Sequence, residues 1–246
     1  MAADEFTGKV VLITGAGRGA GRQVAVAFGA LGAVIAANDI SPLSLDETID
    51  LVHRAGGSGD GFVFDIAKGM PVQGLVAEVL GRYGRIDCLV IHASVAPNAG
   101  LLDMDEWDFH RTLDVNLAGA FYAMQQVGRV MRQQGGGVMV QLISMQQAVQ
   151  KGYCAYTASQ AGLVGLTQAA AAELEPYHIR LNSICYGEGS MGSAPLTEWD
   201  STPFNSWLDM SPAGAQQPRL VQLVLYLCAE AAEGVSGRVI TLEFLG

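Results

Sequence analysis

Positive charge is scarce in this sequence. Only 14 lysines and arginines stand against 24 aspartates and glutamates in 246 residues, so the formal net charge is −10 and the sequence pI is about 4.7. A surface with this balance repels the phosphates of nucleic acids and the headgroups of anionic membranes. We therefore expect neither nucleic acid nor a membrane as a partner.

Long apolar runs are missing as well. No stretch approaches the roughly 18 uninterrupted apolar residues that a membrane-spanning helix requires. The opening MAADEFTGKV carries neither the basic flank and apolar run of a secretory signal nor the arginine bias of a transit peptide. These absences predict a soluble protein that is not exported.

Cysteine and histidine are few and scattered. The cysteines are Cys88, Cys154, Cys185 and Cys228, and the histidines are His53, His92, His110 and His178. No CxxC pair is present, and a chain with a large core needs no disulfides, so we expect reduced thiols and a cytoplasmic location. The histidines have no ligand spacing to one another or to the cysteines, which predicts no metal site.

Short apolar runs, by contrast, are frequent, and they alternate with stretches of helical period. Half of the residues are hydrophobic and 15% are charged, which is typical of a folded chain. The predicted strands are Lys9–Thr14, Ala33–Asp39, Gly61–Asp65, Arg85–His92, Gly137–Ser144, Ile179–Cys185 and Arg238–Phe244. The predicted helices are Gly21–Leu31, Leu43–Ala55, Met70–Tyr83, Trp107–Gln134, Tyr156–Glu175 and Arg219–Ala229.

The predicted strands are nearly continuous in apolar residues, as strands covered on both faces must be. Their alternation with helices, joined by right-handed crossovers, predicts a parallel sheet. We therefore expect an α/β fold in which residues 1–246 form a single Rossmann-type domain. Its doubly wound parallel sheet has about seven strands, with helices on both faces.

Residues 186–217 form the one long irregular segment of the sequence. They are rich in glycine, serine and proline but include the aromatic residues Trp199, Phe204 and Trp207. A loop of this length inside a compact domain is usually functional, which favours a substrate lid. The alternative is a surface excursion with a small core of its own.

A glycine-rich segment follows the first predicted strand and precedes a helix. It reads Thr14-Gly15-Ala16-Gly17-Arg18-Gly19-Ala20-Gly21. In such a turn glycines allow the backbone to approach a pyrophosphate, while the helix N-terminus supplies N–H groups and partial positive charge. Asp39 ends the second predicted strand, where a carboxylate can accept hydrogen bonds from ribose hydroxyls. This combination predicts a dinucleotide site that includes Gly15, Gly17, Gly19, Gly21 and Asp39.

The pattern TGxxxGxG at residues 14–21 is accompanied by Asn116 in DVNLAG, Ser144 in LISM and Tyr156 in AYTASQAG. With these motifs the sequence resembles the classical short-chain dehydrogenase/reductase family over nearly its whole length. The resemblance implies an oxidoreductase that interconverts a carbonyl and a secondary alcohol, with Asn116, Ser144 and Tyr156 as catalytic residues. Tyr153 is the competing tyrosine, but it lacks the following ASxAG pattern.

The resemblance also implies the cofactor, although two signals conflict. Asp39 lies where members that prefer NAD carry an acid, whereas Arg18 lies at a position that is often basic in NADP users. We favour NAD(H), because a carboxylate beside a 2′-phosphate is repelled while an arginine can turn into solvent, and NADP(H) stays open. The remaining residues assigned to the cofactor by resemblance are Asp65, Ile66, His92, Ala93, Ser94 and Gly187.

Gln160 is the most consequential departure from the family, which carries lysine four residues after the tyrosine. Glutamine can hold the nicotinamide ribose, but it cannot lower the pKa of Tyr156. A unit charge at about 4–5 Å and an effective dielectric near 20 contributes roughly 3–4 kcal/mol, so its loss raises the phenol pKa by about two to three units. We therefore expect weakened catalysis, with alcohol oxidation affected more than carbonyl reduction.

Other departures gather around the cofactor. Ile91-His92-Ala93-Ser94 replaces the family's NNAG turn, and Tyr186-Gly187 replaces its Pro-Gly. Ser94 restricts a backbone position that is glycine in the family, so the nicotinamide pocket is expected to differ. His92 is interpreted mainly as a structural residue, with a catalytic role as the alternative. Lys151 is a candidate substitute for the missing ammonium, although it precedes the helix that carries Tyr156.

Two hypotheses follow for the function. The first is an NAD(H)-dependent oxidoreductase with a small-molecule carbonyl or alcohol substrate and weakened activity. The second is a catalytically silent dinucleotide-binding protein of the same fold that serves as a sensor or an assembly partner. The small-residue face of the helix 156–175 either packs on the sheet or joins subunits, and the resemblance favours a homotetramer or homodimer.

Overall fold

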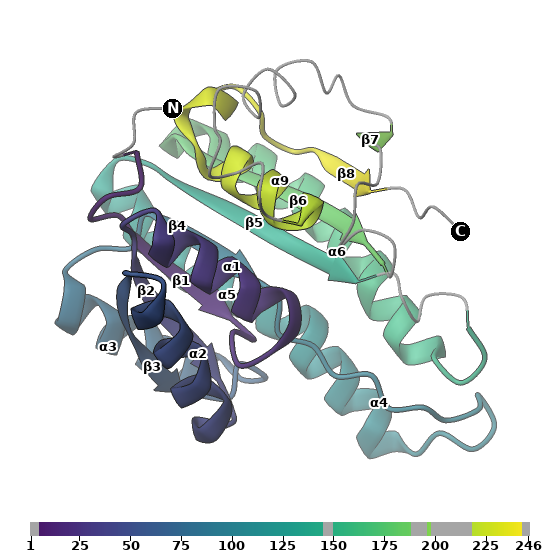
Figure 1. Cartoon of the computed structure of the whole chain (residues 1–246). Helices are drawn as coiled ribbons and strands as arrows, with labels where there is room; N and C mark the ends of the chain where they lie inside the picture. Colours follow the sequence, from purple (N-terminus) through teal and green to yellow (C-terminus); the bar gives the residue numbers. More distant parts are fainter. Residues whose placement is uncertain (1–4, 145–149, 188–195, 198–217, 243–246) are drawn as a thin grey trace.

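The sheet has the predicted parallel architecture. The computed structural model describes residues 5–144, 150–187, 196–197 and 218–242, in which eight strands form one sheet in the order β3-β2-β1-β4-β5-β6-β8-β7 (Figure 1). The strands are β1 (Val10–Thr14), β2 (Val34–Asp39), β3 (Ser58–Val63), β4 (Cys88–Ile91), β5 (Gly137–Ser144), β6 (Ile179–Tyr186), β7 (Leu196–Thr197) and β8 (Val239–Leu242). Seven of them pair in parallel, which confirms the prediction, and β7 adds a short antiparallel strand at the edge.

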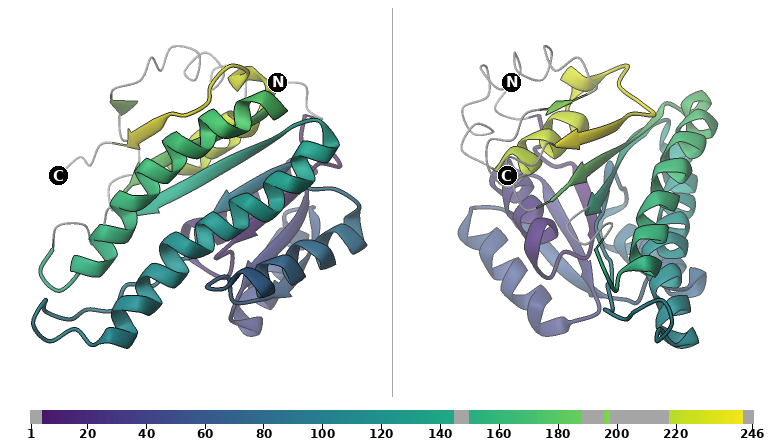
Figure 2. Two further views of the ribbon diagram at one scale, coloured as in Figure 1. Left: turned by 180° about the vertical axis from the view of Figure 1, so that it is seen from behind. Right: turned by 90° about the vertical axis from the view of Figure 1, so that its right-hand side faces the viewer.

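Helices cover both faces of this sheet (Figure 2). They are α1 (Gly19–Ala30), α2 (Pro42–Arg54), α3 (Gly69–Tyr83), α4 (Glu106–Leu113), α5 (Gly119–Gln134), α6 (Cys154–Leu174) and α9 (Arg219–Cys228). One apolar core joins α1, α2 and α9 to the sheet, and a second joins α3, α5 and α6 to the opposite face. All five residues of β1 are buried between these two cores, which is why its sequence, VVLIT, shows no polar alternation.

Strand β3 begins and ends earlier than the prediction of Gly61–Asp65. It pairs with β2 from Ser58 opposite Val34 to Val63 opposite Asp39. As an edge strand, β3 pairs with β2 alone, and Phe62 is its one buried side chain. Glycine and aspartate are tolerated at the start of this strand. The run of apolar residues therefore predicted the presence of the strand correctly but its bounds wrongly.

The single helix predicted over Trp107–Gln134 is interrupted. A π-helical turn, Asp114–Ala118, separates α4 from α5. Such a turn changes the direction of the side chains that follow it and is frequent at functional sites. Here it contains Asn116.

The winding of the sheet reverses between β1 and β4. From β1 the chain proceeds to β2 and β3 on one side, whereas β4, β5, β6 and β8 extend on the other. Thr14 at the end of β1 and Ile91 at the end of β4 are register partners. The glycine-rich turn and the segment that begins at His92 therefore meet at the carboxyl edge, where ligands bind in such sheets.

Most of the predicted lid, residues 188–195 and 198–217, lies outside the described residues. Within the described residues, Tyr186 ends β6 and Leu196–Thr197 form β7. Among the helices described, none is long and apolar enough to span a bilayer.

Candidate active site

Two adjoining clefts open at the carboxyl edge of the sheet. The first, here called the Asp39 cleft, has a volume of about 390 Å³, and the second, the Tyr156 cleft, has about 850 Å³. They share six lining residues, Arg18, Ile40, His92, Ser94, Val95 and Arg111. An elongated ligand can therefore extend from one cleft into the other.

The structure brings most of the predicted site residues to these clefts. The Asp39 cleft is lined by Gly15, Arg18, Asp39, Asp65, Ile66, His92, Ala93 and Ser94. The Tyr156 cleft is lined by Arg18, Gly19, His92, Ser94, Ser144, Tyr156 and Gly187. Gly17, Gly21, Asn116 and Gln160 do not line either cleft, so any role they have is indirect in this conformation.

The glycine-rich turn leaves no room for a side chain at Gly15, Gly17 or Gly21. Gly15 has a φ of +67°, and a Cβ atom there would lie 2.6 Å from the backbone nitrogen of Ala93. Arg22 supports the turn from α1: its guanidinium donates to the carbonyl of Gly17 and, at 3.0 Å, to Oγ1 of Thr48. Arg22 could not be predicted from the sequence, because an arginine in the first turns of a helix has no distinctive spacing.

The carboxylate of Asp39 is held in place by backbone N–H groups. Gly17 donates to Oδ2 and Ser41 donates to Oδ1, each at 3.1 Å. The side chain is partly exposed on the Asp39 cleft, so it can still accept hydrogen bonds from a ligand's hydroxyl groups.

Asp65 forms an ion pair that the sequence did not predict. Its Oδ2 lies 2.9 Å from Nη1 of Arg111 in α4, and its Oδ1 accepts from the backbone N–H of Ala67 at 3.0 Å. Burial raises the pKa of Asp65, but the hydrogen bonds from Ala67 and Arg111 outweigh burial, and the pKa lies below its usual value. Arg111 lines both clefts, so this pair connects α4 to the site.

Tyr156 lies at the base of the Tyr156 cleft, close to Ser144. The tyrosine is 2% exposed, and its hydroxyl donates to the Ser144 carbonyl at 2.9 Å. Burial raises the pKa of Tyr156, while a hydrogen bond with the Ser144 side chain lowers it. No cation among the described residues acts on this phenol, which therefore stays protonated at neutral pH.

Asn116 holds the segment that follows β4. Its Oδ1 accepts from the N–H of Val95 at 2.8 Å, and its Nδ2 donates to the carbonyl of Val95 at 2.9 Å and to Oγ of Ser159 at 3.0 Å. Val95 lines both clefts. In this conformation Asn116 thus shapes the clefts through Val95 rather than by direct contact.

Gln160 is 3% exposed and lies one turn after Tyr156 in α6. Its Nε2 donates to Oγ of Ser159 at 3.4 Å, a long hydrogen bond. The amide is therefore only loosely held and is oriented toward the residues of its own helix.

His92 and Tyr186 form a hydrogen bond that spans the sheet edge. Nε2 of His92 lies 3.0 Å from the Tyr186 hydroxyl, and its Nδ1 lies 3.1 Å from the carbonyl of Gly15. Both side chains line the Tyr156 cleft. Each residue departs from the family's pattern, but the two are 94 positions apart, so their pairing could not be predicted from the sequence.

The competing residues lie farther from the clefts. Tyr153 precedes α6, and its ring meets that of Tyr156 edge-on with centroids 6.5 Å apart. Lys151 is exposed. Neither lines the Tyr156 cleft, so Lys151 is not placed to substitute for a cation beside Tyr156.

The described residues contain no group of three or more histidines, cysteines or carboxylates that could bind a metal ion. The four cysteines are free thiols. What the fold and clefts define is a class of protein: a Rossmann-type sheet with a glycine-rich turn beside a phenol and a serine hydroxyl is the arrangement of a dinucleotide-dependent oxidoreductase.

Comparisons with known proteins agree with this class. A family model described as short chain dehydrogenase matches residues 9–194. An uncharacterised oxidoreductase of Thermotoga maritima is 34% identical over 247 residues, 97% of each chain. D-threitol dehydrogenase of Mycolicibacterium smegmatis is 32% identical over 244 residues, 96% of this chain and 92% of its own. The crystal structure of NAD⁺-bound xylitol dehydrogenase superposes with a TM-score of 0.80 and 27% identity, covering 97% of this chain and 98% of its own.

The chain belongs to the short-chain dehydrogenase family. It is an enzyme of the oxidoreductase class that interconverts carbonyls and alcohols, and its fold is that of enzymes that bind NAD(P)(H). The match over residues 9–194 includes the glycine-rich turn, Asn116, Ser144 and Tyr156.

Proposed function

We propose that the protein is an NAD(H)-dependent oxidoreductase that interconverts a small-molecule carbonyl and a secondary alcohol. The observation that carries this proposal is the continuity of the two clefts. The Asp39 cleft fits the adenosine of the dinucleotide, and the Tyr156 cleft fits its nicotinamide end. The dinucleotide supplies or accepts the hydride when it is bound. The similar structure of xylitol dehydrogenase contains bound NAD⁺, which supports the same cofactor here.

Each residue has a distinct role in this proposal. Gly15, Gly17, Gly19 and Gly21 admit the pyrophosphate to the N-terminus of α1. Tyr156 gives its proton to the carbonyl oxygen during reduction, and Ser144 donates a hydrogen bond to the same oxygen. Asn116 positions Val95. Gln160 takes the place of a lysine, and we propose that it holds the nicotinamide ribose after a rotation of its loosely bonded amide.

The experiment that tests the proposed function measures turnover and binding on one preparation. NADH-dependent reduction of a broad carbonyl panel and NAD⁺-dependent oxidation of alcohols, including threitol and xylitol, are followed beside a fluorescence titration with NADH. We expect micromolar to millimolar binding, as is typical of enzyme ligands, together with slow turnover. Tight NADH binding without turnover of any substrate would instead support the catalytically silent sensor or assembly protein.

Asp39 is expected to set the preference for NAD(H) over NADP(H). Its carboxylate would lie beside the 2′-phosphate of NADP(H) and repel it, so the Asp39→Ala variant should narrow the preference by about tenfold or more. The ratio of the two dissociation constants measures this effect. Arg18→Ala is the matched control, and it should widen the preference slightly. Equal or tighter binding of NADPH by the wild type would show that Arg18 governs the choice.

We further propose a homodimer or homotetramer formed through α6, and a cytoplasmic location consistent with the free thiols. Most small residues on the face of α6 that the sequence singled out are exposed, which favours subunit contact over packing on the sheet. The exposed ones are Ala158, Ala161, Gly165, Ala169 and Ala172. Phe121 of the neighbouring α5 is also 43% exposed. Sedimentation of the wild type and of Gly165→Glu is expected to show a larger assembly only for the wild type.

A further inference from the structure

The side chain of His92 lies where the two clefts meet, and it lines both of them. Its ring packs against the glycine-rich turn: a Cβ atom at Gly21 would lie 2.9 Å from Nδ1 of His92, and one at Gly19 would lie 4.0 Å from Cε1. The backbone N–H of His92 donates to Oγ1 of Thr14 at 3.2 Å, which fixes the residue at the end of β4. The imidazole is therefore held against the turn that precedes α1.

Both ring nitrogens of His92 have hydrogen-bond partners on other elements. Nδ1 lies 3.1 Å from the carbonyl of Gly15, and Nε2 lies 3.0 Å from the Tyr186 hydroxyl. The carbonyl of Gly15 can only accept, so Nδ1 carries a hydrogen. In a neutral ring Nε2 is then an acceptor, to which Tyr186 donates. The two partners thus fix the position and the tautomer of the neutral ring.

The same two partners can hold the ring when it is protonated. An imidazolium donates from both nitrogens, and the Tyr186 oxygen has lone pairs that can accept from Nε2. Only the hydroxyl hydrogen of Tyr186 must turn away, because the distance between the nitrogen and the oxygen suits either direction of the bond. His92 can therefore gain a positive charge without moving.

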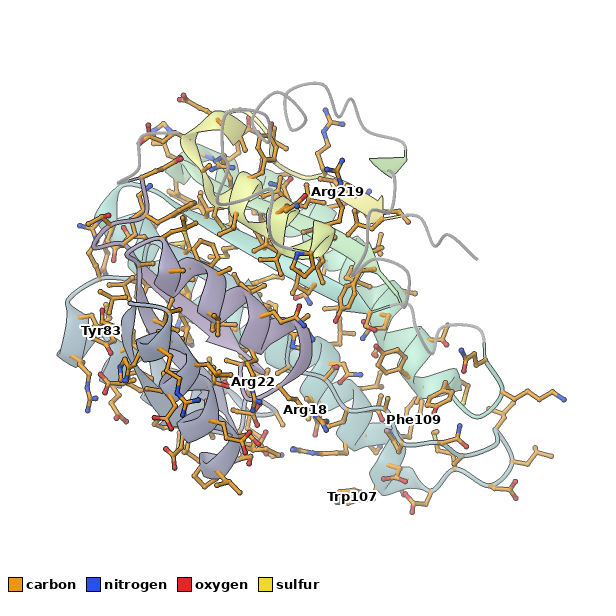
Figure 3. The ribbon with its side chains drawn as sticks, viewed as in Figure 1. Arg18, Arg22, Tyr83, Trp107, Phe109 and Arg219 are labelled. Carbon is orange, nitrogen blue, oxygen red and sulfur yellow. The ribbon has the colours of Figure 1, made fainter. Side chains whose placement is uncertain are left out.

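Basic side chains gather in the section that the two clefts share. Three of its six lining residues are Arg18, His92 and Arg111, in a protein whose net charge is −10. Arg18 comes from the turn before α1 (Figure 3) and is exposed, whereas Arg111 is paired with Asp65. A dinucleotide that spans both clefts places the diphosphate between its two nucleosides in this shared section. The diphosphate is anionic, so these side chains attract it.

We propose that His92 recognises the diphosphate of the bound dinucleotide by taking up a proton when the dinucleotide binds. The inference rests on the proposed function, in which a dinucleotide occupies both clefts, and it adds a residue that makes this binding depend on pH. Arg18 supplies a permanent charge at the same place, whereas His92 supplies a charge that the ligand induces. Because both ring nitrogens keep their protein partners, His92 acts through its charge and not through a hydrogen bond to phosphate.

The groups around His92 leave its ring neutral at pH 7 in the protein without ligand. Burial lowers the pKa of His92 below its usual value of 6.5, and the positive charge of Arg18 also lowers it. The hydrogen bond with Gly15 and the carboxylate of Asp39 raise the pKa, but they do not outweigh burial. The charge on His92 is therefore absent until a further anion arrives.

The other titratable groups beside His92 keep their charge states over the same pH range. Burial raises the pKa of Tyr156 and that of Tyr186, so both phenols stay uncharged at neutral and acid pH. On α4, Asp108 and Arg111 line the Tyr156 cleft with opposite charges. A bound diphosphate is thus the change that favours the imidazolium, and its negative charge raises the pKa of His92.

The linkage between proton and ligand has a definite sign. Because the imidazolium attracts the diphosphate, the dissociation constant decreases as the pH falls through the pKa of His92 in the complex. The dissociation constant stops decreasing below the lower pKa of His92 in the free protein. Each unit by which the ligand raises the pKa corresponds to about a tenfold gain in affinity.

Isothermal titration calorimetry with ADP-ribose, which contains the diphosphate and lacks the nicotinamide, tests this role between about pH 8 and pH 5. For the wild type we expect an affinity gain of about tenfold or more at the acid end. We also expect proton uptake on binding near pH 6.5, measured as a dependence of the binding heat on the ionisation enthalpy of the buffer.

Two variants show whether the charge of His92 causes this gain. His92→Gln keeps a donor and an acceptor but cannot gain a proton, so it should bind within about threefold of the wild type at pH 8 and lose the gain at pH 5. His110→Gln is the matched control. His110 of α4 is exposed, lies 3.6 Å from Glu106 and lines neither cleft, so the variant should keep the wild-type pH profile.

A wild-type dissociation constant that does not change with pH would overturn this role of His92. So would a pH dependence that persists in His92→Gln, or an equal loss of affinity at every pH in that variant, as a merely structural role would give. Proton-linked binding without turnover of any substrate would contradict the proposed function alone, and turnover with pH-independent binding would contradict the role of His92 alone. No binding of ADP-ribose at any pH would contradict both.

Discussion

Replacing Tyr156 by phenylalanine is expected to lower kcat/KM for carbonyl reduction by about 10²–10⁴-fold, the usual contribution of a general acid. The substitution removes the hydroxyl that bonds to Ser144 and that is proposed to give its proton to the substrate oxygen. The ring stays in place because its apolar surface is buried. Steady-state kinetics with the best carbonyl of the panel, together with an NADH titration, measure the effect.

Tyr153→Phe is the control for this experiment. Tyr153 contacts the ring of Tyr156 edge-on, so the substitution preserves the aromatic contact and removes only a hydroxyl outside the cleft. We expect less than a threefold change in kcat/KM. If Tyr153→Phe were the inactive variant and Tyr156→Phe the active one, the assignment of the acid would be reversed.

The substitution Gln160→Lys is expected to increase alcohol oxidation at pH 7 more than it changes carbonyl reduction. In the proposed function Tyr156 is the base for oxidation, and an ammonium one helical turn away, with Cβ atoms about 5–6 Å apart, lowers the pKa of Tyr156. By the Coulomb estimate of roughly 3–4 kcal/mol, the increase at pH 7 is up to about a hundredfold. Carbonyl reduction uses the protonated phenol, so the change in the reduction rate should be smaller.

The environment of residue 160 limits this gain. The side chain of Gln160 is 3% exposed, and its amide donates to Oγ of Ser159 at 3.4 Å. A lysine there loses hydration, which lowers its own pKa and reduces the charge that it provides. Gln160→Met, of similar length but without charge, is the control. If lysine and methionine gave the same pH profile with unchanged NADH affinity, the charge at residue 160 would have no role.

Several features of this protein were predictable from its sequence because they arise from local periodicity or from short motifs. Continuous apolar runs such as VVLIT identify strands buried on both faces, and their alternation with helices requires parallel crossovers. The glycines at 15–21 and Asp39 lie within one βαβ unit, so their proximity follows from that unit alone. Ser144 and Tyr156 are separated by one short connection at the same edge of the sheet, and the sequence was sufficient to bring them together.

Other features depend on contacts between distant segments. The bounds of β3 depend on its pairing with β2, and apolar content could not reveal them. The π-helical turn at Asn116 has no sequence signal, because the same residues suit an uninterrupted helix. Arg111 of α4 pairs with Asp65, 46 residues earlier, only because the fold brings α4 to the segment that follows β3.

The pairing of His92 with Tyr186 shows most clearly what each level decides. The sequence determined the fold and the family, because each depends on motifs or on the period of a strand or helix. The strand order β1-β4-β5-β6 decided the rest: it places the end of β4 one strand away from β6, within reach of a tyrosine side chain. Residues 94 positions apart thereby share a hydrogen bond beside the Tyr156 cleft, and only the tertiary structure could show this pairing.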